Sequence, residues 1–519
     1  MTLQATTRRL FIALAISATA PLSARAQDTS ATQGVVVTHH QVTVAGKVLR
    51  YTARAGFIPI RDNEAGDVHA NLFFIAYTLD GAVKHRPLTF LWNGGPGSNS
   101  GLVHLLGFGP KRIVAATGNM PRYSLAGTAL VDNPDTWLTV SDLVFVDPIG
   151  TGYSRPTKAE YAAEFYQSPG DAEAVAEFIR VYRNRYDVAD APLFLMGESY
   201  GVTRASLVSE ALERRRTTVS GVILLSGGFP LPSDVSPSVR AALLLPTFTA
   251  AAYTNHKLVA DLQRLSIHDA IAASKAYALG GYAAALARGD SLSQTERDAV
   301  IMQLARFTGL PATEINKNLR VSMDQVSTTL LGPTMTVGHY DSRAVGPRDT
   351  TQTIYDPTTD PSLKDILDGA SVVRYMRDEL GFKSDVFYQG PFGGGYPPST
   401  SFRGDWMSVR WGRGEAPAAE PVTQGRASGR GRGGAPMAQG LAAATATDPS
   451  LRVFVACGYF DLGGGCYVSE HSAQHVSADL ARRVTARVYG GGHATYTDDA
   501  ARRQLFADVT KFIQSAVAK

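Results

Sequence analysis

A serine flanked by glycines is the residue whose setting most clearly indicates chemistry. Residues 197–201 are Gly-Glu-Ser-Tyr-Gly, a G-x-S-x-G pentapeptide. The short apolar run at 191–196 predicts a buried strand before it, and apolar residues at helical spacing predict a helix after it. A serine on such a tight strand-to-helix turn exposes its hydroxyl outside the sheet. We therefore interpret Ser199 as a nucleophile, the alternative being a glycine-rich turn that serves packing alone.

A serine hydroxyl needs a base to take its proton, and the base needs a carboxylate to orient it. In hydrolases with this kind of turn the chain order is serine, then acid, then histidine. Asp461 follows a strand-like run at 451–456, and His493 follows another at 485–489 across three glycines. A helix is predicted between them, from about 469 to 483. Asp461 and His493 are the candidate acid and base.

Acyl transfer also requires donors for the negative charge that develops on the carbonyl oxygen. One candidate is the backbone N–H of Tyr200, which follows the nucleophile. The second is expected from an earlier glycine-rich loop. The strand-like run at 89–92 leads into such a loop at 93–98.

Six segments in one order resemble the signatures of the serine carboxypeptidases, peptidase family S10. They are residues 93–100 (NGGPGSNS), 133–137 (NPDTW), 147–154 (DPIGTGYS), 197–200 (GESY), 458–461 (GYFD) and 491–493 (GGH). The resemblance runs from about residue 90 to the C-terminus. It implies an α/β-hydrolase fold, with a mostly parallel central sheet, helices on both faces and a helical cap insertion.

The resemblance also implies a role for individual residues. Ser199, Asp461 and His493 match the catalytic triad, and the N–H groups of Gly95 and Tyr200 match the oxyanion hole. The group that binds the free C-terminal carboxylate of a peptide is matched by Asn93, Gly94 and Glu198. A glutamate can donate a hydrogen bond to a carboxylate only when it is protonated, so this role favours acidic pH.

The sequence departs from the family pattern at four places, which are Ser98 in the glycine-rich loop, Gly107 in place of a second glutamate, the Val202-Thr203-Arg204 stretch after the elbow, and Ala494 after the histidine. Without a partner carboxylate at Gly107, we expect Glu198 to ionise more readily. Arg204 has two interpretations. Its guanidinium either binds one of the carboxylates, or it lies on an outer helix face and pairs elsewhere.

The N-terminus has the pattern of a secretory signal peptide over residues 1–26. Arg8 and Arg9 precede a short apolar segment, and 24–26 is an A-x-A cleavage site. The paired arginines indicate either a twin-arginine signal or an ordinary export signal. We therefore predict a periplasmic or secreted protein. No later run of apolar residues is long enough to predict a membrane span.

Charge gives no support for a nucleic-acid partner. The formal charge of +4 includes three arginines within 1–26, so the mature chain carries about +1 (+4 − 3). An RGG-like run at 426–434 can indicate RNA binding. Within an exported enzyme we interpret it as part of a low-complexity surface loop at 417–447.

The expected organisation is a signal peptide at 1–26, a first part of the hydrolase core at 27–229, a cap insertion at 230–348 and a second part of the core at 349–519. Alternating residues over 35–60 and 71–92 predict opening antiparallel strands. A helix is predicted from Ser168, with Ser168 to Asp171 capping it.

Cys457 and Cys466 lie nine positions apart around Asp461. In an oxidising compartment they form either a disulfide or two buried thiols.

The sequence as a whole predicts a serine carboxypeptidase that needs no cofactor and acts on peptides with a free C-terminus. An acyltransferase or esterase with the same triad is the alternative, and a non-catalytic binding protein is a third possibility. His471 and His475 are spaced to share a helical face, but no third ligand is evident, so no metal site is predicted. The oligomeric state and the preferred terminal residue stay open.

Overall fold

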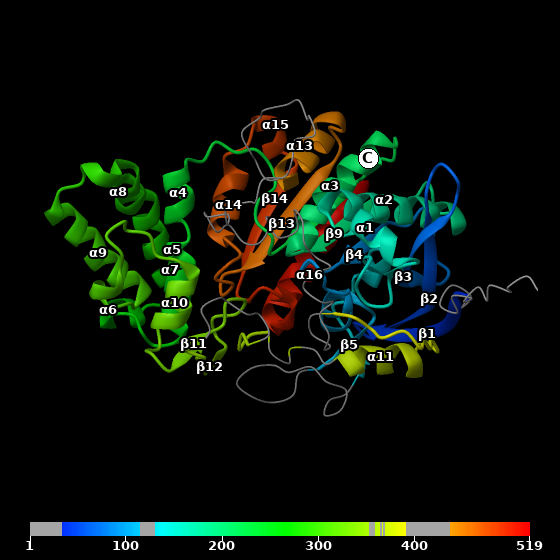
Figure 1. The fold of residues 1–519 in the computed structure, drawn as a ribbon, viewed down its shortest axis with the longest axis horizontal. Helices are drawn as coiled ribbons and strands as arrows, with labels where there is room; N and C mark the ends of the chain where they lie inside the picture. The colour runs from blue at the N-terminus through cyan, green and yellow to red at the C-terminus, as the bar shows by residue number, and fades with distance from the viewer. Residues whose placement is uncertain are drawn as a thin grey trace, which may run out of the picture.

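The computed structural model describes residues 34–114, 130–351, 359–363, 366, 369–390 and 436–518. Ten strands within these ranges form one mixed sheet (Figure 1). Its path follows β1 (Val36–Val44), β2 (Lys47–Arg61), β3 (Val68–Leu79), β7 (Asp142–Asp147), β4 (Leu88–Trp92), β9 (Leu193–Glu198), β10 (Gly221–Leu225), β13 (Arg452–Gly458) and β14 (Val484–Tyr489), and β8 (Arg155–Pro156) pairs with β3.

The strands that precede the candidate site residues are parallel neighbours. From β7 through β4, β9, β10 and β13 to β14 every pairing is parallel, whereas β1, β2, β3 and β7 pair antiparallel in succession. Parallel strands end at the same edge of a sheet, so the loops after β4, β9, β13 and β14 gather there. This is the predicted α/β-hydrolase architecture.

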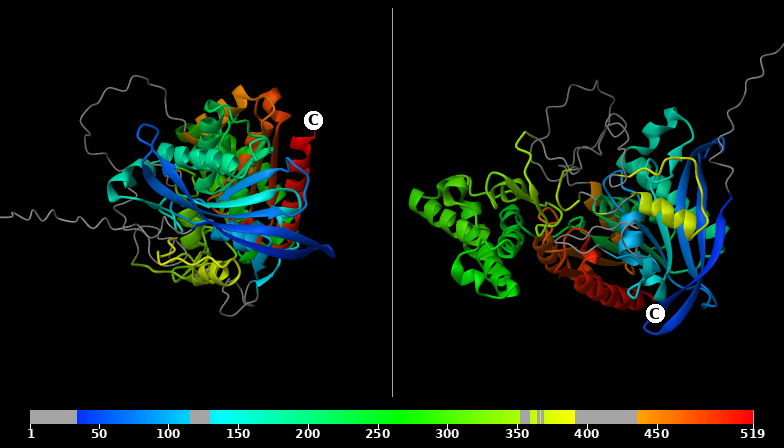
Figure 2. Two further views of the ribbon diagram at one scale, coloured as in Figure 1. Left: turned by 90° about the vertical axis from the view of Figure 1, so that its right-hand side faces the viewer. Right: turned by 90° about the horizontal axis from the view of Figure 1, so that it is seen from below.

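Apolar side chains on both faces explain why the central strands are continuous hydrophobic runs. Along β9, Leu193 and Leu195 belong to one core, and Phe194 and Met196 belong to the other. The first core lies under α2 (Ser168–Arg185), α3 (Tyr200–Arg214) and α13 (Pro436–Thr447). The second lies under α11 (Gly369–Asp378) and α16 (Asp499–Val517). Figure 2 shows the N-terminal strands between α2 on one side and α11 on the other.

The prediction of opening antiparallel strands is confirmed for 35–60 and for β3, but it is wrong for 88–92, because β4 pairs parallel with β7 and β9. β1 and β2 make a hairpin in which Val44 pairs with Lys47. The two turn residues, Ala45 and Gly46, both have positive φ, at 47° and 77°. A two-residue turn of this kind matches the twist of the strands that it connects.

A helical body is inserted between β10 and β13, and it stands beside the β13–β14 side of the sheet (Figure 1). Its helices are α4 (Pro237–Ala242), α5 (Leu245–Thr254), α6 (Ala260–Gln263), α7 (Ile267–Tyr277), α8 (Ala283–Arg288), α9 (Gln294–Thr308) and α10 (Met323–Thr329), and the strands β11 (Met335–Val337) and β12 (Val345–Pro347) follow them. Its core includes Tyr459, Phe460 and Leu462 from the loop that carries Asp461. The insertion therefore packs directly against the candidate site.

Three sequence-based expectations are corrected. The predicted loop at 417–447 is a helix in its last part, because α13 packs on α3. The helix predicted over 469–483 is two helices, α14 (Cys466–Gln474) and α15 (Ala478–Ala481). The helix α2 begins at Ser168, but its N-cap is Gln167, which makes no side-chain capping bond. The predicted signal peptide and the RGG-like run lie outside the described residues.

Candidate active site

Ser199 occupies a strained turn between a strand and a helix. β9 ends at Glu198 and α3 begins at Tyr200, and Ser199 between them has φ 61° and ψ −128°. A non-glycine residue with positive φ costs conformational energy, which the surroundings must repay. The Ser199 N–H donates to the carbonyl of Leu225 at 2.9 Å, which ties the turn to the end of β10. A Cβ on Gly197 would collide with the carbonyl of Gly201, so the flanking glycines permit the turn.

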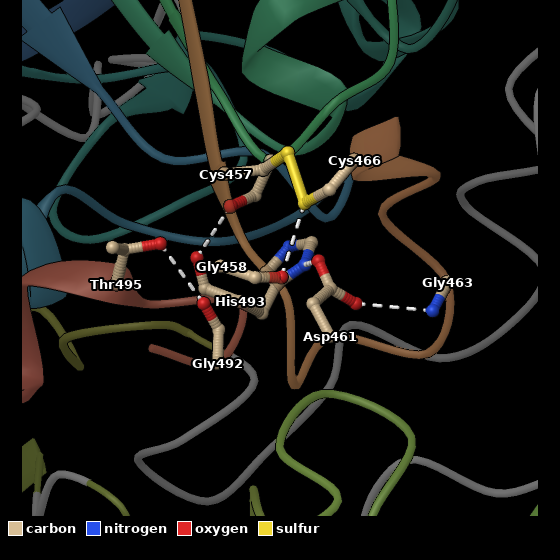
Figure 3. The surroundings of a disulfide bond; sticks show 9 residues. Cys457, Gly458, Asp461, Gly463, Cys466, Gly492, His493 and Thr495 are labelled. Atoms are coloured by element: carbon tan, nitrogen blue, oxygen red, sulfur yellow. Dashed lines mark hydrogen bonds and ion pairs between the residues drawn. A yellow bond between two sulfur atoms is a disulfide. The ribbon is translucent and has the colours of Figure 1, made fainter. Parts of the chain in front are cut away.

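His493 and Asp461 lie in direct contact. The His493 Nδ1 is 2.6 Å from the Asp461 Oδ2, and both side chains are buried. The other carboxylate oxygen of Asp461 accepts from the Gly463 N–H at 3.1 Å, as Figure 3 shows. Burial lowers the pKa of His493, but the Asp461 carboxylate and Glu198 outweigh it, so the net pKa is raised. This pair has the geometry of a base held by its orienting acid.

The loop that carries His493 is held by segments distant in sequence. The His493 N–H donates to the Tyr340 carbonyl at 2.6 Å, and the Tyr340 ring lies edge-on to the imidazole at 4.8 Å between centroids. The Ser226 hydroxyl donates to the His493 carbonyl at 2.6 Å. Tyr340 follows β11 of the insertion and Ser226 follows β10. Sequence reasoning missed both residues, since neither lies in a recognisable motif.

The glycine-rich loop lies against the elbow. A Cβ on Gly94 would collide with the backbone nitrogen of Tyr200 and lie 2.6 Å from the Glu198 carbonyl, so only glycine fits there. Gly95 has φ 101°. Because Tyr200 is the first residue of α3, its N–H lies at a helix N-terminus, where negative charge is favoured. The oxyanion roles of Gly95 and Tyr200 stay predictions that this placement permits.

Asn93 and Glu198 form a buried pair, and Glu198 directly precedes the nucleophile. The Asn93 Nδ2 donates to the Glu198 Oε1 at 2.9 Å, and the Asn93 Oδ1 accepts from the Val103 N–H at 3.2 Å. These two bonds fix which way the amide points. Burial raises the pKa of Glu198 to about 7, although His493, Tyr496 and Asn93 act in the opposite direction. Glu198 therefore keeps its proton below about pH 7 and can donate to an anion.

A disulfide joins Cys457 at the end of β13 to Cys466 at the start of α14 (Figure 3). The bridge closes the loop that contains Asp461 and Gly463. Of the two interpretations of the cysteines, the structure has the disulfide. A covalent closure limits the conformations of this loop and so helps to hold the carboxylate in place.

No cluster of three or more His, Cys, Asp or Glu side chains with metal-binding geometry occurs in the described part of the chain. The rings of His471 and His475 lie 4.0 Å apart, and the His475 Nδ1 is 2.8 Å from the His471 carbonyl.

Among the helices of the described ranges, none is both long and apolar enough to cross a bilayer.

Comparison with known proteins agrees with this geometry. The family model of serine carboxypeptidases, Peptidase_S10, matches residues 45–285. Over these residues the chain is therefore similar to the Peptidase S10 family. The matched residues include Asn93, Gly95 and Ser199, and Asp461 and His493 lie beyond them.

Two curated relatives resemble part of the chain. It is 29% identical over 170 residues to a pheromone-processing carboxypeptidase KEX1 of Yarrowia lipolytica, and this alignment covers 32% of this chain and 25% of the relative. It is 27% identical over 135 residues to serine carboxypeptidase S10 family member 1 of Dictyostelium discoideum, and that alignment covers 25% of this chain and 29% of the relative. The alignments thus span between a quarter and a third of these relatives.

A solved structure covers more of the chain at lower similarity. Kex1(delta)p, a prohormone-processing carboxypeptidase from Saccharomyces cerevisiae, aligns over 89% of this chain and 91% of its own, with 16% identity and a TM-score of 0.47.

Arg204 pairs elsewhere, as the second interpretation of its sequence position expected, but not on an outer helix face. Its side chain is fully buried. The Nε donates to the Asp171 Oδ2 at 2.8 Å, and a terminal nitrogen donates to the Asn93 carbonyl at 2.8 Å. Its guanidinium also lies 5.1 Å from the centre of the Tyr200 ring. Arg204 therefore supports the backbone of Asn93 and pairs with α2, while the Glu198 carboxyl bonds to the Asn93 amide.

The expectation that Glu198 ionises more readily without a carboxylate at position 107 compares it with a glutamate pair that this chain lacks, so it stays a prediction. Glu198 is 2% exposed, and burial raises its pKa to about 7 without any second carboxylate at position 107. A buried charge loses its hydration, which disfavours the ionised carboxylate.

Proposed function

We propose that this protein is a serine carboxypeptidase that removes residues from the free C-terminus of peptides. The Asn93–Glu198 pair carries the proposal, because it places a neutral amide and a proton-bearing carboxyl beside the nucleophile elbow. Such a pair can bind a terminal carboxylate without placing a buried anion against it. The Peptidase S10 match and the similarity to carboxypeptidases support the same assignment.

In the proposed reaction Ser199 attacks the last peptide carbonyl while His493 takes its proton. Asp461 holds the imidazole through the 2.6 Å contact and stabilises its positive charge. The N–H groups of Gly95 and Tyr200 stabilise the oxyanion. His493 then returns the proton to the leaving amine, and water releases the shortened peptide from Ser199.

We also propose that the protein is an exported bacterial member of the family. The pattern of basic residues, short apolar segment and A-x-A site at 1–26 supports export, and a disulfide suits an oxidising compartment. Appearance of a chain that begins at Gln27 in the periplasmic or culture fraction of a bacterial host tests this. Retention of residues 1–26 on a cytoplasmic product contradicts it.

The test of the activity is a mass-spectrometric digest of a peptide mixture by the purified protein. Loss of single residues from free C-termini is the expected result. Ester hydrolysis or acyl transfer without cleavage of these peptides favours the alternative use of the same triad. Failure of a fluorophosphonate to label the folded protein would instead favour a binding protein.

Replacing Asn93 with alanine is expected to weaken recognition of the terminal carboxylate. The kcat/KM for free-acid peptides should fall by roughly 5- to 100-fold, which corresponds to about 1–3 kcal/mol for an unpaired buried group. Peptides with an amidated C-terminus should lose much less. Equal losses for both kinds of peptide would show that the end group is bound elsewhere.

The pH profile should report the protonation of Glu198. Because its pKa is about 7, kcat/KM for free-acid peptides should fall above that pH, reaching about one tenth of its plateau near pH 8. The acid limb should follow His493, whose pKa is raised above its usual 6.5. Because Glu198 and His493 interact, the pH midpoints of the two limbs describe the coupled pair and not either residue alone.

Glu198→Gln provides the matched control, because an amide donates without titrating. This variant should lose the alkaline limb, and its acid limb should move to lower pH because Glu198 no longer raises the pKa of His493. A wild-type profile that falls steeply above about pH 5, or an unchanged limb in Glu198→Gln, would contradict the assignment.

A further inference from the structure

A hairpin loop of the helical insertion, residues 338–344, lies against both loops that carry the candidate acid and base. This hairpin loop connects β11 to β12. It is closed by its own backbone, because the Gly338 N–H donates to the Ala344 carbonyl at 2.9 Å and the Ala344 N–H donates to the Asp341 carbonyl at 3.0 Å. The hairpin loop therefore has a defined shape where it meets the site.

Backbone hydrogen bonds join the hairpin loop to both chain neighbours of Asp461. The Ser342 N–H donates to the Phe460 carbonyl at 2.9 Å. The Leu462 N–H donates to the His339 carbonyl, also at 2.9 Å. Bonds on either side of a residue restrict the movement of its backbone, so the position of the Asp461 carboxylate depends on the hairpin loop.

The same hairpin loop is bonded to the loop of the base. The Tyr340 carbonyl accepts from the His493 N–H at 2.6 Å. A Cβ on Gly492 would lie 2.6 Å from the Asp341 Oδ2 and 2.7 Å from the Tyr340 carbonyl, so the two loops are in close contact there. Asp461 and His493 come from separate loops (Figure 3), and the hairpin loop is bonded to both.

The two catalytic loops also bond to each other directly, but at a different place. The Phe460 N–H donates to the Gly491 carbonyl at 3.0 Å. Both residues of this bond precede the functional side chains. The bonds from the hairpin loop reach His493 itself and the residue after Asp461, so they constrain the other side of the pair.

Arg343 holds the hairpin loop in place through three charged hydrogen bonds. Its Nε and one terminal nitrogen donate to the two carboxylate oxygens of Asp341, at 2.9 and 2.7 Å. The other terminal nitrogen donates to the Asp498 Oδ2 at 2.9 Å. The guanidinium also lies 4.7 Å from the centre of the Phe460 ring. This set of contacts uses the planar fork of an arginine, which a lysine cannot reproduce.

Asp498 connects Arg343 to the segment that follows His493. It is the N-cap of α16, and its Oδ1 accepts from two N–H groups in the first turn of that helix, at 3.0 and 3.1 Å. One guanidinium therefore joins the insertion to the start of α16. The side chains of Arg343, Asp341 and Asp498 are 28%, 12% and 26% exposed, so water and salt screen these ion pairs only in part.

We propose that Arg343 is a positioning residue, which fixes the hairpin loop against both catalytic loops and so maintains the contact between Asp461 and His493. The catalytic role of that contact rests on the proposed function. An imidazole and a carboxylate on separate loops stay 2.6 Å apart only while the loops keep their relative position. A displacement of about 1 Å at a catalytic group can cost on the order of 10²-fold in rate.

The first test compares Arg343→Met with the wild type by proton NMR. The proton on the His493 Nδ1 lies in a short bond to a carboxylate. Such a proton resonates far downfield of an ordinary imidazole N–H, and the absence of the signal in His493→Gln assigns it. In Arg343→Met the resonance should move upfield or broaden, because a looser contact lengthens the bond and exposes the proton to exchange. This measurement needs no substrate.

Kinetics of the same variant should separate positioning from substrate binding. The kcat for release from a free-acid dipeptide should fall roughly 10- to 100-fold. KM should change by less than about twofold, because Asn93 and Glu198 keep their contacts. The rate of fluorophosphonate labelling at Ser199 should fall by a factor similar to that of kcat, because labelling also depends on the base.

Arg306→Met is the matched control. Arg306 also lies in the insertion, on α9, where it pairs with Asp261 and lies 5.6 Å from the centre of the Phe307 ring. Its side chain is 35% exposed, which is close to the value for Arg343. This variant should leave the resonance, kcat and the labelling rate unchanged.

Asp341→Asn is a second variant, which removes the charge that binds Arg343 but keeps one oxygen that can accept a bond. The resonance should move in the same direction as in Arg343→Met, by a smaller amount. Should Arg343→Met fail to fold, the resonance of Asp341→Asn provides the test by itself.

The outcomes distinguish this inference from the proposed function. A resonance and a labelling rate that keep their wild-type values in the folded variants overturn the role of Arg343, whatever the enzyme cleaves. An equal change in Arg306→Met overturns it as well, because the effect would then belong to the insertion in general. A change confined to the Arg343 and Asp341 variants supports the role even if the wild type removes no residue from free-acid peptides. In that case only the proposed function fails.

Discussion

Ser199→Ala and His493→Ala should each reduce kcat/KM by roughly 10³-fold or more while the protein folds normally. Alanine at 199 removes the attacking oxygen, and alanine at 493 removes the base that takes its proton. Because the two residues act as one unit, the double variant should be little worse than either single one. Some catalysis over water should survive, because Gly95, Tyr200 and the carboxylate-binding pair remain in place.

The measurement is single-residue release from a free-acid dipeptide, with folding checked by thermal denaturation. Fluorophosphonate labelling should disappear in Ser199→Ala. Thr495→Ser, which changes a nearby buried residue whose hydroxyl donates to Gly492, is a control that should keep most activity. Turnover retained in folded Ser199→Ala, or losses that multiply in the double variant, would refute the mechanism.

Arg204→Met should destabilise the protein by about 3–5 kcal/mol, because it leaves a buried carboxylate without its guanidinium partner. The side chains of Arg204 and Asp171 are 0% and 2% exposed, so water cannot replace the lost partner. The variant also removes a donor from the Asn93 carbonyl, so activity should fall at every pH.

Urea denaturation gives the free energy of unfolding for this comparison. Arg180→Met is the matched control, since Arg180 forms an exposed i,i+3 ion pair with Glu177 on α2. Its loss should change the free energy of unfolding by less than about 0.5 kcal/mol. Arg204→Met combined with Asp171→Leu should recover much of the loss, because no buried charge is left unpaired. A free energy of unfolding unchanged in Arg204→Met would show that the pair does not stabilise the fold.

Local geometry explains why the sequence predicted the elbow so well. A serine held at positive φ between a strand and a helix needs small neighbours at 197 and 201. All the residues that meet this requirement lie within five consecutive positions, so the sequence shows them directly. The strand before Asp461 was predictable for a similar reason, since a run buried on both faces is mostly apolar. Parallel pairing then brings the ends of these strands to one edge of the sheet.

Features that depend on packing between distant segments were not predictable in this way. The helix α13 forms in a stretch of low complexity because α3 gives it a surface to pack on. The contact of Tyr340 with His493 depends on how the helical insertion meets the loop after β14. Nothing in the local sequence of either segment records these contacts.

The sequence by itself determined the elbow, the order of the candidate triad and the strands that bring it together. These depend on turn geometry and on apolar patterning, which are properties of neighbouring residues. Only the tertiary structure decided that burial raises the pKa of Glu198 to about 7 and that Arg204 donates to the backbone of Asn93. The physical reason is that a pKa and a buried ion pair depend on the water excluded by every segment packed around them. That exclusion exists only once the chain has folded.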